Sequence, residues 1–419
     1  MKICLVTAFP PSRRGLNEYG FHIARELQRD PFLSLTVLAD EIDQASAPVR
    51  ELPDYHIVRC WRFDSFANPV RLLNAIRGLK PDVVWFNLLF STFGKHPLSA
   101  FLGLTVPAAS RLMGRYTHVT LHHLMDNIDL KDAGIRFASL YRLGGSVATR
   151  MLLMANSVSV LLPAYRRTLL DKYRGRNIHF RAHGILSARP EPPDYQRRNA
   201  GPRRILAFGK WGTYKRLELL LDAFGRLRQR MGGVRLIVAG GNHPATPGYV
   251  ERVAAGVQGD PDIEFTGYVA EDDIPELFRN ASVLVLPYSS ATGASGVAHL
   301  ACEYGVPIIS AGIEDFREMA WYEGLAIVFY QTGDAASLAN EMEHLLNDPQ
   351  RMREMSEQNF SAALRMTMPQ VIRQYLRSFD LQHRARALEP ISRFRRLPSW
   401  VPSRSAIFRV AAPRWESWI

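Results

Sequence analysis

The stretch RILAFGKWGTYKRLELLLDAF, residues 204–224, combines a strand, a loop and a helix in direct succession. RILAF is an apolar run that predicts a buried strand, and LELLLDAF carries apolar residues at helical spacing. The loop between them holds two glycines and three cations, including Lys210 and Lys215. Backbone N–H groups at a helix start and nearby ammonium groups attract the same anion. The stretch therefore favours an anion-binding turn in an α/β domain over the plainer alternative of a solvated helix cap.

Strand–helix alternation continues on both sides of this stretch. Downstream, the pattern predicts strands at 234–241, 263–267, 282–287, 307–310 and 325–330, and helices at 217–231, 248–256, 272–280, from about 296, and at 335–347. Upstream, it predicts strands at 2–9, 33–40, 57–63, 81–87, 117–122, 157–162 and 178–184, with a helix after the first strand and another at 69–79. The predicted fold class is α/β, with two Rossmann-like doubly wound domains facing each other across a cleft. Ligands of such folds bind at the carboxyl ends of the strands, so we expect the site in that cleft.

A segment rich in proline and arginine divides the chain. It spans 186–203 and holds hardly any apolar residue, which is typical of a linker. We therefore predict one Rossmann-like domain at 1–185 and a second at 204–365. Residues 366–383 are predicted to form a C-terminal helix that crosses back to the first domain, and 384–419 a basic tail.

Composition restricts the class of protein. Hydrophobic residues make up 47% of the 419 and charged residues 22%, as in folded globular proteins. Cys4, Cys60 and Cys302 are scattered, which argues against a disulfide framework and against metal-ligand spacing. The N-terminus lacks the length and the cleavage site of a signal peptide, so we expect a soluble, intracellular protein. The net charge of +12 leaves phosphate ligands, an anionic membrane, nucleic acid and simple solubility open.

Three further segments place polar or small residues at predicted strand ends. FPPSRRGLNEYG, residues 9–20, leads from a strand into a helix through Gly15, which allows close backbone approach to an anion. It is not GxGxxG, so a dinucleotide dehydrogenase is weakly supported. VTLHHLMD, residues 119–126, ends a strand with two adjacent histidines, which are either cleft residues or ordinary surface histidines. LPYSSATGASGVAHLACEYGVPII, residues 286–309, offers a loop of small residues before a helix start, which suits a phosphate.

In this order and spacing, these segments resemble the retaining glycosyltransferases of the GT-B fold, glycosyltransferase family 4. The resemblance extends from Lys2 to about Phe379. It is strongest over 204–345, where FGKWGTYKRLELLLDAF, LIVAGG, FTGYVAEDDIPELFRNASVLVLPYS and GVPII follow the order of that family. The resemblance implies that 1–185 binds the acceptor and that 204–365 binds a nucleotide sugar.

The resemblance also assigns roles to residues that contact the diphosphate and the sugar of the donor. Lys210 stands where the family usually has the arginine of its diphosphate clamp, and Lys215 matches the clamp lysine. Gly15 matches the loop over the diphosphate. His122 matches the histidine that faces the donor sugar.

Two further matches concern the nucleotide. Tyr268 and Val269 sit where the family holds the base. Ser295, Gly296 and Val297 match the helix start whose backbone amides hold the phosphates.

One departure from the family pattern concerns its two glutamates, which are separated by seven residues. Counted back from the GVP motif, their positions hold Thr292 and Leu300, neither of which is an acid. The first glutamate normally faces the sugar and the second holds the ribose. Glu303 lies one turn further along the same helix face and is a candidate substitute.

The resemblance implies an enzyme that moves a hexose from a UDP- or GDP-linked donor to a saccharide or lipid-linked saccharide, with retention of the anomeric configuration. The expected setting is bacterial polysaccharide or glycolipid assembly. Such enzymes stabilise the leaving diphosphate with cationic side chains and helix dipoles, so we expect no metal and no cofactor. A diphosphate oxygen would assist the incoming hydroxyl, since no carboxylate nucleophile is identified.

Two alternatives remain open at this point. The departure from the family's glutamates fits a catalytically silent, nucleotide-sugar-binding subunit of a membrane-surface assembly. A sugar-nucleotide epimerase on the same fold would need a cluster of acid–base carboxylates, which the sequence does not show.

Two segments of the first domain mix apolar residues with arginine, at 97–116 and 136–154, and the tail adds RFRRLPSW and PRWESWI. Short stretches of this kind suit a membrane interface, while core helices and a solvated tail are the alternative. Membrane contact would favour a polyprenyl-linked acceptor. We expect a cytoplasmic protein, peripheral on the inner face of the cytoplasmic membrane if this contact exists, and no nucleic-acid partner.

Overall fold

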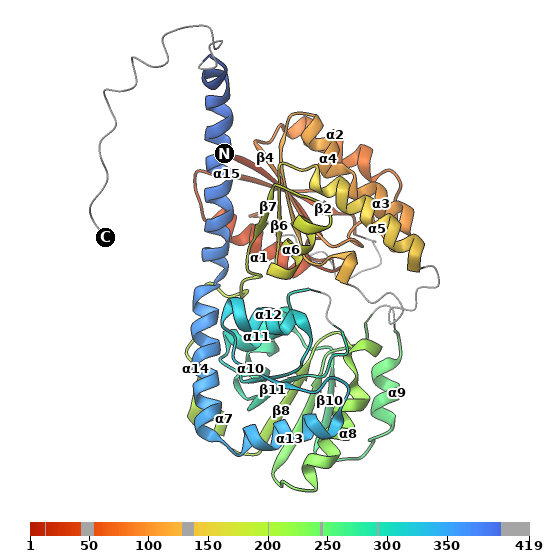
Figure 1. The fold of residues 1–419 in the computed structure, drawn as a ribbon, viewed down its shortest axis with the longest axis vertical. Helices are drawn as coiled ribbons and strands as arrows, with labels where there is room; N and C mark the ends of the chain where they lie inside the picture. Colours follow the sequence, from red (N-terminus) through yellow and green to blue (C-terminus); the bar gives the residue numbers. More distant parts are fainter. Residues whose placement is uncertain are drawn as a thin grey trace, which may run out of the picture. The chain divides into compact units, whose positions relative to one another are not determined.

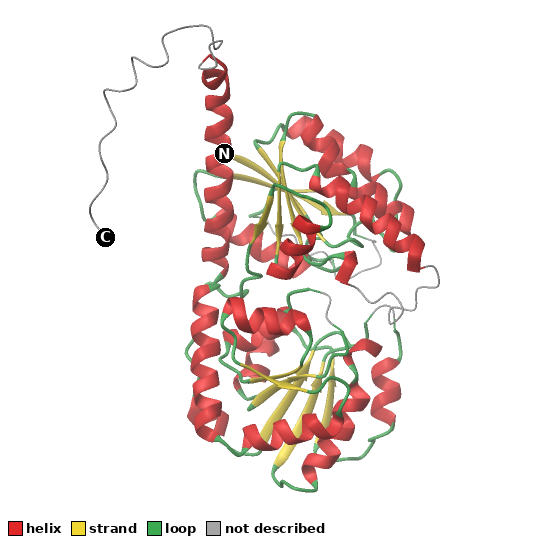
Figure 2. Cartoon of the chain, viewed as in Figure 1, coloured by secondary structure: helices red, strands yellow, loops and turns green. Residues whose placement is uncertain are grey.

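The computed structural model describes residues 1–12, 14–42, 54–127, 138–199, 201–243, 246–290 and 293–394. Met1–Ile372 form one compact unit, which contains two parallel β-sheets with their helices (Figures 1 and 2). A second unit begins at Arg373, and its described part is the continuation of helix α15 (Met368–Phe394). The two sheets confirm the predicted fold class, α/β with two Rossmann-like doubly wound domains.

The first sheet has seven strands in the order β3-β2-β1-β4-β5-β6-β7, and each neighbouring pair is parallel. Its strands are β1 (Lys2–Val6), β2 (Ser34–Asp40), β3 (Ile57–Trp61), β4 (Val83–Leu88), β5 (Tyr116–Leu121), β6 (Ser157–Val160) and β7 (Ile178–Phe180). Every residue of β4 and β5 is buried, as expected for central strands covered on both faces. The strand order reverses between β1 and β4, which is where doubly wound sheets open a crevice for ligands.

The helices of this half are α1 (Asn17–Gln28), α2 (Asn68–Leu79), α3 (Pro97–Leu104), α4 (Val106–Leu112), α5 (Ala138–Leu153) and α6 (Pro163–Asp171), with a short 3-10 turn η1 (Met125–Asn127). The sequence pattern predicted α1 and α2 but not α6. Pro163 stands at the start of α6, a position that proline favours, so this helix carried a signal that the apolar pattern alone did not show. The mixed segments 97–116 and 136–154 contain α3, α4 and α5, with 136 and 137 outside the described residues.

The second sheet repeats the topology with six strands in the order β10-β9-β8-β11-β12-β13, again with parallel neighbours. Its strands are β8 (Arg203–Phe208), β9 (Val234–Ala239), β10 (Ile263–Gly267), β11 (Val283–Leu286), β12 (Ile308–Ala311) and β13 (Ile327–Tyr330). The switch in strand order falls between β8 and β11. The turn after β8 is the glycine- and lysine-rich loop that the sequence singled out.

The helices of the second half are α8 (Leu217–Arg228), α9 (Tyr249–Ala255), α10 (Ile274–Arg279), α11 (Gly296–Glu303), α12 (Glu314–Glu323), α13 (Ala335–Leu346) and α14 (Pro349–Arg365), with short turns η2 (Thr213–Lys215) and η3 (Glu271–Asp273). Of these, α12 and α14 were not predicted. Asp348 caps α14 by accepting a hydrogen bond from the Arg351 N–H at 2.9 Å, and Pro349 follows it. This cap and proline are a recognisable helix start.

The predicted linker at 186–203 contains a short helix, α7 (Tyr195–Asn199), whose Arg198 is buried. Its guanidinium donates to the carbonyl oxygens of Gly305 at 2.7 Å and Tyr304 at 2.7 Å, and to Ser356 Oγ at 3.1 Å. These carbonyls lie at the end of α11, where helix carbonyls lack partners within the helix. The linker is therefore anchored to the second half near its own C-terminal end.

A backbone contact joins the two halves within the same unit. Ile185, which follows the first sheet, donates its N–H to the Met366 carbonyl at 2.8 Å, and it pairs with Thr367 as an isolated parallel bridge. The exit from the first sheet therefore lies beside the residues that follow α14. The ranges predicted for the domains themselves stay predictions.

None of the helices in the described residues is both long and apolar enough to cross a membrane. The predicted basic tail at 384–419 lies outside the described residues from 395 onward.

Arg198→Met tests the anchoring of the linker. We expect the free energy of unfolding to fall by about 2–4 kcal/mol, because hydrogen bonds to a charged group contribute about 1.5–3 kcal/mol each and are not additive. Urea denaturation measures the loss. Arg226→Met is the matched control, since Arg226 is exposed and forms an ion pair with Asp222 on its own helix, α8. Equal stability of the two variants would show that the Arg198 contacts do not hold the linker.

Candidate functional site

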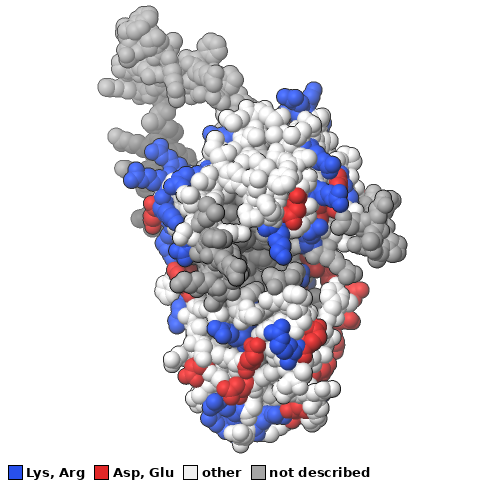
Figure 3. All heavy atoms as spheres, turned by 90° about the vertical axis from the view of Figure 1, so that its right-hand side faces the viewer, with Lys and Arg blue, Asp and Glu red and all other residues white. Residues whose placement is uncertain are grey.

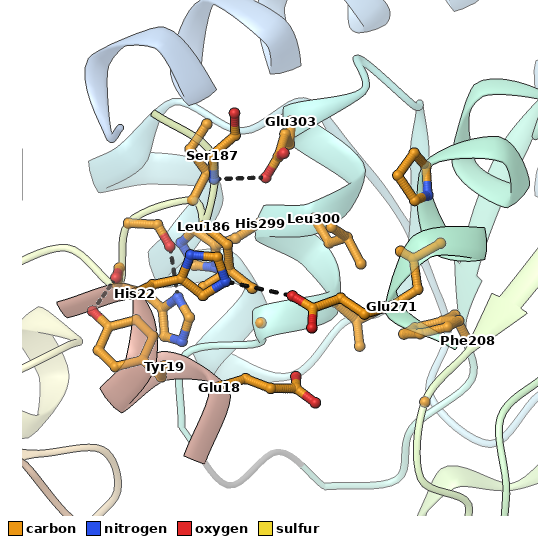
Figure 4. Close-up of a pocket in the computed structure, with 18 of the residues that line it drawn as sticks. Glu18, Tyr19, His22, Leu186, Ser187, Phe208, Glu271, His299, Leu300 and Glu303 are labelled. Atoms are coloured by element: carbon orange, nitrogen blue, oxygen red, sulfur yellow. Dashed lines mark hydrogen bonds and ion pairs between the residues drawn. The ribbon is translucent and has the colours of Figure 1, made fainter. Parts of the chain in front are cut away.

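A pocket of about 1140 Å³ opens at the carboxyl ends of the strands, where the switch points of both sheets lie (Figure 4). Its walls come from the turn after β1 and helix α1, from the segment after β7, from the turns after β8, β9 and β10, and from α11. Seven of the ten predicted site residues line it: Gly15, Lys210, Tyr268, Val269, Gly296, Val297 and Glu303. The other three, His122, Lys215 and Ser295, do not line it.

The floor of the pocket depends on two glycines. A Cβ atom on Gly240 would lie 2.0 Å from the Gly209 carbonyl oxygen, and Gly240 has a φ of +103°. Only glycine tolerates both this backbone conformation and this contact. The turns after β8 and β9 therefore meet backbone to backbone, which leaves the space above them for a ligand.

Lys215 is buried against this floor, with 8% of its surface exposed. A Cβ on Gly209 would lie 2.7 Å from Lys215 Nζ and 3.9 Å from Val297 Cγ2. This one glycine therefore separates the Lys215 ammonium from the start of α11. The ammonium lies 4.9 Å from the centre of the Tyr288 ring, and no carboxylate pairs with it among the described residues. Burial, assisted by the charge of Lys210, lowers the pKa of Lys215 to about 8. Lys210 itself is exposed and lines the pocket.

The start of α11 presents free backbone donors at the same place. Ser295 caps the helix, because its Oγ accepts a hydrogen bond from the Ala298 N–H at 3.2 Å. The amides of Gly296 and Val297, the first two residues of the helix, therefore have no partner within it and line the pocket. A helix start of this kind attracts an anion.

The predicted base-binding residues lie at another part of the wall. Tyr268 is 79% exposed, and Val269 packs partly against the core. An exposed aromatic ring beside an apolar side chain can stack on a flat heterocycle.

Gly15 and His122 occupy different positions relative to the pocket. A Cβ on Gly15 would come within 3.1 Å of Leu89 Cδ1, so a larger residue would press on this turn.

His122 is buried, and its Nε2 lies 2.6 Å from Asn87 Oδ1. Its ring meets the edge of Tyr19 at 4.9 Å between centroids, and Tyr19 is the residue that lines the pocket. Burial, with nearby His183, lowers the pKa of His122 well below its ordinary value, so the ring is neutral.

Helix α1 contributes polar residues that the sequence analysis did not identify. Glu18, His22, Arg25 and Arg29 all line the pocket, at spacings of four, three and four residues. His22 reaches across to Glu271, with its Nε2 atom 3.7 Å from Oε1, and this contact lowers the pKa of Glu271 (Figure 4). The helical spacing was visible in the sequence as a polar face, but nothing there showed that this face points into the cleft.

A buried histidine lies under the start of α11. The two ring nitrogens of His299 contact the Ser295 carbonyl oxygen at 2.8 Å and Glu323 Oε2 at 2.9 Å. Both partners are acceptors, so the ring carries both protons and a positive charge. Burial opposes this charge, but Glu323 and the carbonyl outweigh it and raise the pKa of His299. His183 stacks on the ring with 4.9 Å between centroids.

The two positions at which the family carries glutamates differ in their surroundings. Thr292 lies outside the described residues. Leu300 lines the pocket and carries no polar group. Glu303 also lines it, is 7% exposed, and accepts a hydrogen bond from the Ser187 N–H at 3.4 Å (Figure 4). Burial raises the pKa of Glu303 to about 7.

Three carboxylates thus line the pocket, Glu18, Glu271 and Glu303, although the sequence suggested no such cluster. Within the described part of the chain, no three His, Cys, Asp or Glu side chains come together as metal ligands. The prediction that the protein needs no metal stays a prediction.

Residues 202–348 match the family model described as Glycosyl transferases group 1. This part of the chain is therefore similar to that family. The match covers the second sheet, Lys210, Lys215 and the start of α11, so it falls on the part of the chain in which the sequence resemblance is strongest.

Similar proteins extend the likeness to the first sheet. An uncharacterized glycosyltransferase of Bacillus subtilis (strain 168), YqgM, is 24% identical over 279 residues, which are 64% of this chain and 72% of that protein. Sucrose-phosphate synthase from Thermosynechococcus elongatus has a TM-score of 0.73 at 14% identity, over 92% of this chain and 100% of that one. Anabaena HepE in complex with UDP-glucose has a TM-score of 0.68 at 15% identity, over 91% and 99%. These structures share the GT-B fold that the sequence predicted.

The charged state of His299 has a consequence for stability. Its folded pKa is raised above 6.5, so its contribution is complete below about pH 6.5 and is lost as the pH rises through the folded pKa. His299→Gln keeps hydrogen-bonding capacity but removes the charge. We expect this variant to be about 3 kcal/mol less stable than the parent at pH 6, because Glu323 loses its buried partner, and this difference should shrink toward pH 9.

Urea unfolding of both proteins at several pH values measures this difference. Glu303 and Lys215 titrate in the same range, but they are present in both proteins, so their effects cancel. His183 stays neutral, because burial and the His299 charge lower its pKa to about 3. A stability difference that does not change with pH would show that His299 is uncharged in the folded protein.

Proposed function

We propose that this protein is a retaining glycosyltransferase that moves a hexose from a UDP- or GDP-linked donor to an acceptor hydroxyl. The match to the group 1 family model and the HepE structure, which holds UDP-glucose, support a nucleotide-sugar donor. The acceptor that we propose is a saccharide or a polyprenyl-linked saccharide in bacterial polysaccharide or glycolipid assembly.

The observation that carries the proposal is the convergence of positive groups at Gly209. Lys215 Nζ, exposed Lys210 and the free amides at the start of α11 surround one point of the pocket floor. Each group favours an anion, and their desolvation strengthens their attraction to it. Since Lys215 has no carboxylate partner in the described residues, a diphosphate would supply the charge that it lacks.

These groups would act on the leaving diphosphate. As the bond between the anomeric carbon and the diphosphate oxygen breaks, negative charge grows on that oxygen, where Lys210, Lys215 and the helix start can stabilise it. The acceptor hydroxyl then bonds to the same face of the anomeric carbon, and its proton passes to the diphosphate oxygen. Configuration is retained, and no carboxylate nucleophile is needed.

Glu303 is our candidate for the ribose. It lies one turn from Leu300 on α11, so its carboxylate can replace the one that the position of Leu300 lacks. A carboxylate accepts two hydrogen bonds from neighbouring hydroxyls, whereas a carboxylic acid accepts them less well. Because the pKa of Glu303 is about 7, we propose that ribose binding favours its ionised form.

One observation favours the second candidate function, a nucleotide-sugar-binding subunit without turnover. Leu300 places an apolar side chain on the pocket wall, so the ribose of the donor would lose a polar contact there. In that case the donor would bind and stabilise the protein without release of nucleoside diphosphate.

Lys215→Met tests the clamp. Methionine keeps most of the buried side-chain volume and removes the charge, so the fold should be at least as stable as that of the parent. Because a hydrogen bond to a charged group contributes about 1.5–3 kcal/mol, we expect kcat/KM to fall roughly tenfold to two-hundredfold, with kcat lowered as well as KM raised. Release of nucleoside diphosphate from UDP-glucose and GDP-linked sugars measures turnover.

Lys210→Met should behave similarly, and the double variant should lose less than the sum of the two because both cations serve one leaving group. Arg252→Met is the control, since Arg252 is exposed and lies outside the pocket. Normal turnover of Lys215→Met would refute the clamp assignment. Tight donor binding by the parent protein without any release would instead favour the binding subunit.

Glu303→Gln tests the ribose assignment through pH. Between pH 6 and pH 8 the parent carboxyl becomes largely ionised, so the ratio of parent to variant affinity for UDP should rise, by up to about tenfold. Lys215 works in the opposite direction, since its pKa of about 8 means that it loses charge as the pH rises. Both proteins contain Lys215, so the ratio isolates Glu303.

Isothermal titration calorimetry with UDP gives the affinities, and Glu354→Gln, an exposed helix position, is the control. A ratio that stays constant with pH would leave Glu303 as a structural partner of Ser187 and remove it from the donor site.

A further inference from the structure

A second cavity, of about 400 Å³, opens on the first half of the chain. Four arginines line it: Arg111, Arg150, Arg174 and Arg176. They come from the end of α4, the end of α5 and the turn between α6 and β7. No Asp or Glu lines the cavity, and among the described residues none of the four guanidinium groups is in an ion pair.

The local contacts of these arginines leave most of their donors available. Arg111 donates through Nη1 to the Met154 carbonyl at 2.6 Å, which fixes it against the end of α5. Arg150 lies over the Tyr173 ring, with its guanidinium carbon 5.3 Å from the centroid. Each guanidinium carries five N–H donors, and a group of four suits the several oxygens of a phosphate.

Exposed apolar side chains lie on the two helices whose ends line the cavity. On α5, Leu143 is 63% exposed, Val147 is 40% exposed and Met154 is 41% exposed. With Arg150 they follow spacings of four, three and four residues, so they form one stripe on the helix. Leu112 at the end of α4 is 78% exposed and adjoins Arg111.

The segments of sequence next to the cavity are poor in acidic residues. Residues 83–125 and 138–170 contain no Asp or Glu, and they include all of α3, α4 and α5. These helices lie side by side in Figure 1, and the view in Figure 3 faces them, with a broad uncharged surface and both basic and acidic atoms at its border. Asp126, which accepts a hydrogen bond from Tyr173 of the cavity wall, is already ion-paired with Lys172. An exposed surface that combines apolar side chains with arginines that pair with none of the described carboxylates is complementary to an anionic bilayer.

We propose that the arginine cavity binds the phosphate of an anionic lipid headgroup, with the apolar stripe of α5 entering the membrane interface. A soluble phosphate would leave the stripe exposed to water, and a nucleic acid would gain nothing from it, so both fit this surface less well. The proposal rests on the proposed function only for its purpose, which is to bring the protein to a lipid-linked acceptor. Membrane binding itself requires no sugar transfer.

The test compares two double variants of the full chain that lose the same charge. Arg174→Gln with Arg176→Gln removes half of the cavity's arginines, and Arg252→Gln with Arg351→Gln removes two exposed arginines from the second half. Sedimentation with vesicles of phosphatidylglycerol mixed with phosphatidylcholine measures partitioning, and pure phosphatidylcholine is the reference. We expect the cavity variant to lose about tenfold to thirtyfold in partitioning to the anionic vesicles and the control to stay near the parent.

Leu143→Ser with Val147→Ser should also weaken partitioning, and this loss should persist at high salt, where the contribution of the arginines is screened. Equal losses in the cavity and control variants would overturn the proposal, because general charge would then explain binding. So would binding of inorganic phosphate or of a single-stranded RNA at the cavity without vesicle binding. UDP titration keeps the proposals separate: vesicle binding without UDP binding would support the membrane site while the donor assignment failed.

Discussion

The shape of the large pocket depends on one close contact between two backbones. The turns after β8 and β9 meet at Gly209 and Gly240, where a side chain would lie 2.0 Å from a carbonyl oxygen. This contact removes side chains from the pocket floor, and Lys215 fills the space beneath it. The ammonium is thereby held beside the start of α11, and none of the described carboxylates is paired with it. The positive character of the site therefore follows from backbone packing as much as from the choice of lysine.

Burial gives the pocket a set of groups that titrate near neutral pH. It raises the pKa of Glu303 to about 7 and lowers that of Lys215 to about 8, because it disfavours the charged form of each. His299 departs from this rule, since Glu323 and the Ser295 carbonyl hold its charge in place. A ligand that supplies charge or hydrogen bonds to these groups recovers some of the free energy that their burial costs. Binding is therefore coupled to protonation on both sides of the pocket.

The fold was predictable because parallel strands buried on both faces appear in the sequence as continuous apolar runs. The strands around Lys210 and the start of α11 were located to within a few residues, and seven of the ten predicted residues line one pocket. The polar face of α1 was not identified, because helical spacing shows that Glu18, His22 and Arg25 share a face but not what that face meets. The buried role of Arg198 was also missed. Its segment is rich in proline and arginine, as a solvated linker is, and only the fold brings it to the carbonyls at the end of α11.

The contact between Ile185 and Met366 has a mechanical consequence. The Ile185 N–H donates to the Met366 carbonyl, so the exit from the first sheet is held beside the end of α14. Arg198 anchors the linker to the second half later in the chain. Any change in the separation of the pocket walls that α1 and α11 supply would therefore have to be absorbed by the short stretch between residues 186 and 197.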